Sequence, residues 1–211
     1  NISKFNIVIF AIKPQISQLV LREFKMLKFK KNTLFISIVA GKKISFFKSN
    51  LKNIYQIVRI MPNMPALANK GISCLVANKS VSSSNRLKTN YLFSKVGTTI
   101  WMSSEKEIDM ATAISGSGPG YVFTILDAME KATMKLGFSR SLAKKLVVET
   151  FLGSIFLMLK TNKNSKDLAN SIAIKGGTTE AGIKILKKHK VDKIINKSIN
   201  AAYKRAIHLG K

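Results

Sequence analysis

Two segments rich in glycine, serine and threonine are the strongest candidates for chemistry. Residues 115–121 read SGSGPGY and residues 176–179 read GGTT, and each is predicted to open a long helix. A helix N-terminus carries unpaired backbone N–H groups and the positive end of the helix dipole. Such an end suits a carboxylate or a phosphate. We therefore predict that an anionic group binds in front of these segments.

Three further candidates lie where predicted strands end. Lys13-Pro14 closes the first apolar run, Ala40-Gly41 closes the second, and Asn63 lies between two prolines after the third. In open α/β sheets, ligands bind at the carboxyl ends of the strands. Taken alone, Lys13-Pro14 is better explained as a strand that proline terminates. The rigid loop around Asn63 is the more informative signal.

The first half of the chain must supply the elements that position these residues. Unbroken apolar, β-branched runs predict strands that are buried on both faces, and helical spacing separates the first of them. Strands are predicted at 7–12, 33–40, 55–60 and 72–77, and helices at 16–28 and 44–50. This alternation predicts an α/β layer with right-handed crossovers.

After about residue 82 the periodicity becomes helical, so we predict an α/β domain at 1–102 and an all-α domain at 103–211. Helices are predicted at 83–95, 105–114, 119–136, 140–160, 165–173, 178–189 and 191–209. Helix 140–160 is apolar around much of its circumference. Such a helix is typical of a subunit interface, and the centre of a monomeric bundle is the alternative.

The chain is strongly basic, with 36 Lys and Arg against 10 Asp and Glu and a formal net charge of +26. Nucleic acid or an anionic membrane would be the obvious partner. However, 31 of the basic residues are Lys, they are spread along the whole length, and only 5 are Arg. Nucleic-acid readers usually rely on Arg and on aromatic stacking. A composition bias from an AT-rich genome explains the lysines better.

The remaining reactive side chains predict no metal site and no disulfide. Cys74 is the only cysteine and lies in an apolar stretch, which favours a core residue in a reducing compartment. The two histidines, His189 and His208, have no metal-binding partner at usable spacing. No signal peptide or membrane-length apolar stretch is visible. These features predict a soluble cytoplasmic protein.

The motifs together resemble the pyrroline-5-carboxylate reductase family, and the resemblance covers essentially the whole chain. They occur in the order and spacing of that family, and the SGSGP and GGTT segments are its most specific part. The motifs are Lys13-Pro14, Ala40-Gly41, Met61-Pro62-Asn63 with Pro65, Gly71, Val96-Gly97, Glu105, residues 115–119 and residues 176–179.

The resemblance implies an α/β, Rossmann-type domain followed by a helical dimerisation domain. It implies NAD(P)H-dependent reduction of 1-pyrroline-5-carboxylate to L-proline, in a homodimer or larger homo-oligomer. Thr179 would be the catalytic residue, its hydroxyl bonding the ring nitrogen of the substrate. Substrate-binding residues would be Glu105, Gly177, Thr178 and Thr179, with Ser115, Gly116, Ser117, Gly118 and Pro119 from the partner subunit. Residues lining NADP or NAD would be Ala11, Lys13, Pro14, Ala40 and Asn63.

The chain departs from the family pattern at several points. Lys175 stands where relatives usually have proline, and the family's Gly-x-Gly-x-x-Gly turn for the cofactor pyrophosphate does not occur. We expect that the first β-α-β portion of the family's domain is missing from this sequence.

Three alternatives follow from these observations. The first is a catalytically impaired remnant that keeps only the helical scaffold for dimerisation, and the second is a basic nucleic-acid-binding protein. A hydroxyacid dehydrogenase fits less well, because a catalytic Lys there is followed by an Asn one turn later. Here Lys144 and Lys145 are followed by Val148 and Glu149.

Overall fold

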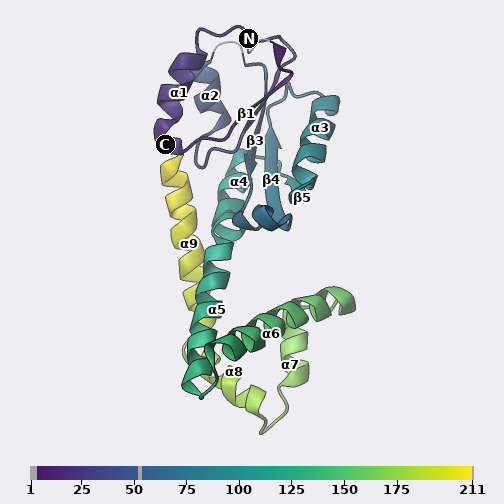
Figure 1. Ribbon diagram of the computed structural model, residues 1–211, viewed down its shortest axis with the longest axis vertical. Helices are drawn as coiled ribbons and strands as arrows, with labels where there is room; N and C mark the ends of the chain where they lie inside the picture. Colours follow the sequence, from purple (N-terminus) through teal and green to yellow (C-terminus); the bar gives the residue numbers. More distant parts are fainter. Residues whose placement is uncertain (1–3, 52–53, 211) are drawn as a thin grey trace. The chain divides into compact units, whose positions relative to one another are not determined.

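The computed structural model describes residues 4–51 and 54–210. The chain divides into two compact units, each considered by itself below (Figure 1). The first unit comprises Asn1–Pro119 together with Ile199–Lys211, and the second comprises Gly120–Ser198. This division falls between residues 119 and 120. The domain boundary near residue 102 that the sequence suggested lies N-terminal to it and stays a prediction.

A five-stranded sheet in the order β1-β2-β3-β4-β5 forms the centre of the first unit. The first three strands are parallel, with Ile7 opposite Leu34 and Leu34 opposite Gln56. The fourth strand runs antiparallel to the third, and the fifth is parallel to the fourth. The strands are β1 (Ile7–Phe10), β2 (Leu34–Ser37), β3 (Gln56–Met61), β4 (Gly71–Ala77) and β5 (Gly97–Trp101).

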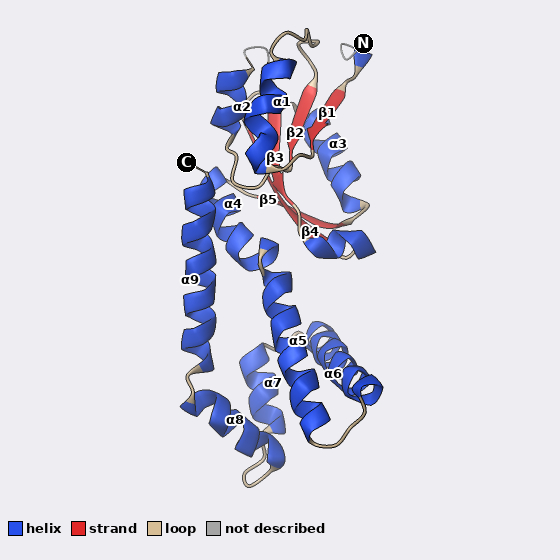
Figure 2. Cartoon of the chain, turned by 60° about the vertical axis from the view of Figure 1, so that its left-hand side comes forward, coloured by secondary structure: helices blue, strands red, loops and turns tan. Residues whose placement is uncertain are grey.

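Helices cover both faces of this sheet, as Figure 2 shows, with α1 and α2 on one face and α3 on the other. Neighbouring residues of one strand therefore enter different cores: Phe35 packs in the first, while Leu34 and Ile36 pack in the second. This two-sided burial explains the unbroken apolar runs of the sequence. The helices of the first unit are α1 (Ser17–Phe24), α2 (Ile44–Asn50), α3 (Ser83–Ser94) and α4 (Glu105–Ala111).

No strand was predicted between the helices at 83–95 and 105–114, where the structure has β5. This strand is only five residues long, and its side chains are exposed or half-buried, so it lacks the apolar run that identified the other strands. It follows α3 and pairs along the whole of its length with β4. The reversal between β3 and β4 is made by the short helix η3 (Met64–Ala68), which contains one of the two prolines flanking Asn63.

Gly97, which begins β5, leaves no room for a side chain. Its φ is +141°, and a Cβ there would lie 2.0 Å from the carbonyl oxygen of Gly71, its partner in the β4–β5 register. We expect Gly97→Ala to lower the free energy of unfolding by about 2 kcal/mol, because the pair must separate or strain. Urea unfolding at fixed protein concentration measures this.

Gly182→Ala is the matched control for Gly97→Ala. Gly182 is exposed within a helix, and a Cβ there would meet nothing within 4 Å. Its replacement should be neutral or stabilise by up to about 1 kcal/mol. Equal unfolding midpoints for the two variants would refute the close approach at Gly97.

The predicted helix 105–114 is interrupted by a π-helix. The α-helix α4 ends at Ala111 and is followed by η4 (Thr112–Gly116), which is a π-helix. The N–H of Ser117 donates to the carbonyl of Thr112 at 2.8 Å. The expectation that residues 115–119 form a turn with several free N–H groups was therefore wrong for Ser117. Instead of a separate helix start at these residues, a widened π-helical turn leads on to the next helix, which begins at Gly118.

The second unit is helical, and its helices agree with the predicted ranges to within one residue at each end. Ser139 caps one of them by accepting a hydrogen bond from the Leu142 N–H at 3.3 Å, and Gly137 before it has a φ of +100°. The helices are α5 (Gly118–Lys135), α6 (Arg140–Thr161), α7 (Ser165–Ile172), α8 (Thr178–Lys188) and α9 (Val191–Leu209), the first and last of which extend into the first unit. Among the residues that the structure describes, no helix has both the length and the apolar character needed to cross a membrane.

Candidate active site

The parallel arrangement of β1, β2 and β3 brings the predicted cofactor residues to one edge of the sheet. Ala11, Lys13 and Pro14 follow β1, Ala40 follows β2 and Asn63 follows β3. Lys13 precedes the short helix η2 (Pro14–Ile16) and its side chain is exposed. Ala40 is small and half-buried, and the adjacent Gly41 packs against Leu209, whose carbonyl oxygen would lie 2.8 Å from an added Cβ.

The Asn63 side chain joins two backbone segments at this edge. Its Nδ2 donates to the carbonyl oxygen of Ser115 at 3.1 Å, and its Oδ1 accepts from the Ile72 N–H at 2.9 Å. The structure thus brings together two residues that the sequence assigned to different parts of the site. The contact of Asn63 with a cofactor stays a prediction.

The π-helix η4 rests on the end of β3. The terminal methyl of the Met61 side chain packs against Gly116, where an added Cβ would lie 2.9 Å from its Cε and would require that flexible end to shift. The Ser115 hydroxyl donates to the Ala111 carbonyl at 2.9 Å and lies 3.8 Å from the Cys74 sulfur. Burial raises the pKa of the Cys74 thiol above its ordinary value, although the contact with Ser115 opposes this. Cys74 is therefore a neutral core residue, as its sequence context indicated.

Glu105 takes part in a charged cluster that the sequence did not reveal. Its Oε1 accepts from Nη1 of Arg59 at 3.1 Å and from the Ile44 N–H, at the start of α2, at 2.9 Å. The Nη2 of Arg59 donates to Oδ1 of Asp109 at 2.6 Å. Only 3% of Arg59 and 6% of Asp109 are exposed. The carboxylate of Glu105 therefore ties α4 to β3 and to α2.

A signal for this cluster was present in the sequence. Arg59 is the one charge in the strand QIVRIM, and Glu105 and Asp109 are spaced by four, which places them on one face of a helix. A buried arginine requires an acidic partner, and this pair supplies two. Arg59 lies 46 residues before Glu105 and 50 before Asp109, so local sequence patterns could not assign the pairing.

The GGTT segment forms the start of α8 in the second unit. Gly177 is the N-cap residue and makes no side-chain capping bond, so the backbone donors of the first turn, at Thr178 and Thr179, are not occupied by a cap. Gly176 has a φ of +79°, which favours glycine. Thr178 is exposed and Thr179 is half-buried. The N–H of Gly177 donates to the Ile174 carbonyl at 2.9 Å, so its predicted role as a donor to a bound anion was wrong, and the donors of Thr178 and Thr179 stay a prediction.

One carboxylate already lies near these donors. Glu180 accepts from the Gly176 N–H at 2.8 Å and pairs with Lys184 at 3.2 Å. The hydrogen bond from Gly176, followed by the bond from Lys184, holds the pKa of the Glu180 carboxyl below its ordinary value. Its bond to Gly176 fixes the turn that enters α8, while the N–H groups of Thr178 and Thr179 remain for another acceptor.

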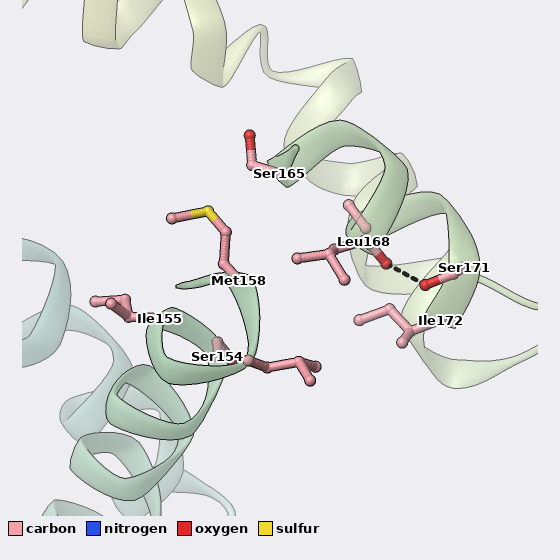
Figure 3. Close-up of a pocket in the computed structure, with 9 residues that line it drawn as sticks. Ser154, Ile155, Met158, Ser165, Leu168, Ser171 and Ile172 are labelled. Atoms are coloured by element: carbon pink, nitrogen blue, oxygen red, sulfur yellow. Dashed lines mark hydrogen bonds between the residues drawn. The ribbon is translucent and has the colours of Figure 1, made fainter. Parts of the chain in front are cut away.

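The structure adds two features of the second unit that sequence reasoning missed. The hydroxyl of Tyr121 is buried and has no hydrogen-bond partner among the described residues. An apolar pocket of about 320 Å³ lies between α6 and α7, lined by side chains such as Ile155, Met158 and Leu168 (Figure 3). In the described ranges, no group of three or more His, Cys, Asp or Glu side chains is arranged to hold a metal ion.

Comparison with known proteins agrees with this geometry. Residues 105–209 match the family model described as pyrroline-5-carboxylate reductase dimerisation. The pyrroline-5-carboxylate reductase of Pseudomonas aeruginosa is 34% identical over 206 residues, which cover 98% of this chain and 75% of that protein. The enzyme of Synechocystis is 32% identical, over 100% of this chain and 77% of that protein.

Solved structures lead to the same family. The crystal structure of Plasmodium falciparum pyrroline carboxylate reductase with NADP bound superposes with a TM-score of 0.92 at 32% identity, covering 99% of this chain and 79% of that one. The Coxiella burnetii pyrroline-5-carboxylate reductase has a TM-score of 0.88 at 33% identity, over 99% of this chain and 77% of that one. Both the α/β sheet and the helical part predicted from the sequence are thereby confirmed. The chain belongs to the pyrroline-5-carboxylate reductase family.

Proposed function

We propose that this chain is an NAD(P)H-dependent oxidoreductase that reduces the C=N bond of 1-pyrroline-5-carboxylate to give L-proline. The observation that carries the proposal is the uncapped start of α8, where the GGTT segment presents backbone donors beside a threonine hydroxyl. The family to which the chain belongs supports the same reaction. A catalytically impaired remnant is the less favoured alternative.

The start of α8 would hold the substrate carboxylate. The N–H groups of Thr178 and Thr179 and the positive end of the helix dipole favour an anion there, while the Gly177 N–H is already bonded to the Ile174 carbonyl. The Thr179 hydroxyl, two residues into the helix, would then bond the ring nitrogen. A protonated imine is already electrophilic, so the site needs orientation and a matched electrostatic environment more than a strong acid or base.

Two further groups complete the proposed substrate site. Residues 115–119, carried by η4 and the start of α5, would be supplied by the partner subunit. Glu105 would lie near the substrate ring. Because its Oε1 is bound to Arg59 and to Ile44, we infer that Glu105 acts there as a fixed negative charge.

The carboxyl edge of β1–β3 would receive the cofactor, NADP or NAD. Bound there, the reduced nicotinamide supplies the hydride that is added to the imine carbon. The residues fit this role: Ala11 and Ala40 are small enough for a ring to approach the backbone, and Lys13 places an exposed positive charge at the same edge. Asn63 lies at the same edge after β3, but its side-chain amide is bonded to Ser115 and Ile72, so it would serve this edge through the loop that it holds and not by a side-chain bond to the cofactor.

The proposal is tested by following NADPH and NADH oxidation with 1-pyrroline-5-carboxylate. We expect substrate-dependent oxidation by the purified chain, with L-proline as the product. A chain that dimerises but oxidises neither cofactor would favour the remnant. The same assay in the absence of substrate is the control for adventitious oxidation.

Homo-oligomerisation is a property of the matched dimerisation region. We propose that α6 provides the main contact surface, because much of its apolar surface is exposed in the single chain. Its exposed apolar residues are Leu142, Leu146, Leu152, Ile155, Phe156, Leu157 and Leu159. Burying such a surface against a second copy is favourable at about 25 cal/mol per Å² of apolar area. We place the protein in the cytoplasm, where its free, buried thiol stays reduced.

A further inference from the structure

We propose that Asn63 is a positioning residue: it fixes the π-helix η4 and thereby the conformation of residues 115–119. The inference rests on the proposed role of residues 115–119 in substrate binding. Asn63 would then act on catalysis through another segment, and its principal effect would be on the substrate rather than on the cofactor.

The Asn63 amide is held in one orientation by its two hydrogen bonds. Its oxygen accepts from the Ile72 N–H at 2.9 Å, and its nitrogen donates to the Ser115 carbonyl at 3.1 Å. A donor lies on one side and an acceptor on the other, so the reverse orientation would oppose like groups at both ends. The side chain is therefore a bridge of fixed polarity between the start of β4 and η4.

The π-helix η4 needs support from outside the helix. A π-helix has poorer packing than an α-helix and persists where its surroundings hold it, frequently at functional sites. Two contacts hold η4 against the end of β3: Asn63 binds the Ser115 carbonyl, and Met61 packs against Gly116. The Ser115 hydroxyl donates to Ala111 in the preceding turn and has a long contact with the Cys74 sulfur at 3.8 Å, whereas the Ser115 carbonyl is bonded from outside the helix by Asn63 at 3.1 Å.

A second asparagine in the same sheet, Asn78, can be compared with Asn63. Asn78 follows β4 and makes the same kind of bridge: its Oδ1 accepts from the Ile57 N–H at 3.0 Å and its Nδ2 donates to the Tyr55 carbonyl at 2.7 Å. Both asparagines are half-buried. The two side-chain bonds of Asn78, however, go to Tyr55 and Ile57 at the start of β3, and neither reaches η4. Asn78 is therefore a matched control for the structural cost of losing such a bridge.

The experiment compares Asn63→Asp with Asn78→Asp. Each variant keeps the acceptor oxygen and replaces the donor by a carboxylate oxygen that faces a carbonyl, so both should lose similar stability in urea unfolding. We expect only Asn63→Asp to raise the KM for 1-pyrroline-5-carboxylate, by about tenfold, with the KM for NADPH unchanged. Asn63→Ala, which introduces no charge, replaces Asn63→Asp if the latter does not fold.

A second readout does not depend on activity. Hydrogen–deuterium exchange of the backbone amides in residues 112–118 should become faster in Asn63→Asp than in wild type or in Asn78→Asp. Unchanged exchange there, or a rise in KM for NADPH instead of the substrate, would overturn the inference. A wild-type chain that does not reduce 1-pyrroline-5-carboxylate would contradict the proposed function, and the exchange comparison would still decide whether Asn63 holds η4.

Discussion

Replacing Arg59 with Met is expected to lower the free energy of unfolding by about 3–5 kcal/mol, the largest effect on stability that we predict for a single substitution. Arg59 is 3% exposed, and its guanidinium bonds two carboxylates, at 2.6 Å to Asp109 and 3.1 Å to Glu105. Methionine fills a similar volume but leaves the buried Asp109 without its partner. An uncompensated buried charge costs several kcal/mol, much more than the ion pair itself contributes. Urea unfolding at fixed protein concentration measures the change.

Two comparisons separate this electrostatic cost from a general loss of packing. Lys131→Met removes the partner of Asp127, an ion pair whose side chains are 65% and 62% exposed, and should change the unfolding free energy by less than about 1 kcal/mol. Adding Asp109→Asn and Glu105→Gln to Arg59→Met removes the uncompensated charges and should recover a large part of the loss. If Arg59→Met costs no more than Lys131→Met, the cluster does not hold α4 on the sheet.

The parts of the fold that sequence could predict are those whose pattern is local. The strands β1, β2 and β3 follow from apolar runs because helices cover both faces of the sheet and every position of β2 is buried. The helices of the second unit follow from their periodicity and their caps, such as Ser139 before α6. The strand β5 was missed because it is short and half-exposed and depends on pairing with β4.

The sequence predicted which residues belong to the candidate site, but it did not predict which of them contact one another. The sequence placed Asn63 and Ser115 in the site but gave no reason for them to touch, because 52 residues separate them and their bond depends on the π-helix. A π-helix differs from an α-helix only in which carbonyl each N–H selects, and tertiary contacts decide that choice. Glu105 was predicted only as a substrate-binding residue. Its bonds to Arg59 and to the Ile44 N–H join segments that are far apart in the sequence, so they could not be predicted from local patterns.

Replacing Thr179 with Ala should reduce kcat/KM for 1-pyrroline-5-carboxylate by about a hundredfold, the largest effect on activity that we predict. The hydroxyl would be lost from the second residue of α8, while the backbone N–H groups proposed to hold the substrate carboxylate would remain. A hydrogen bond to a charged group contributes about 1.5–3 kcal/mol, which corresponds to a rate factor of about ten to a hundred or more. Alanine is well tolerated in a helix, so folding should be little affected. Steady-state kinetics with saturating NADPH measure the loss.

The matched variants decide whether the hydroxyl itself is responsible. Thr179→Ser restores a hydroxyl at the same position and should recover most of the activity. Thr133→Ala makes the same chemical change on α5, where the hydroxyl bonds only the Met129 carbonyl at 2.8 Å, and should leave kcat/KM within about twofold. Full activity in Thr179→Ala would remove the catalytic assignment of this residue while leaving the family and the fold unchanged. A loss that Thr179→Ser does not recover would instead indicate that packing of the threonine methyl group, rather than its hydroxyl, shapes the site.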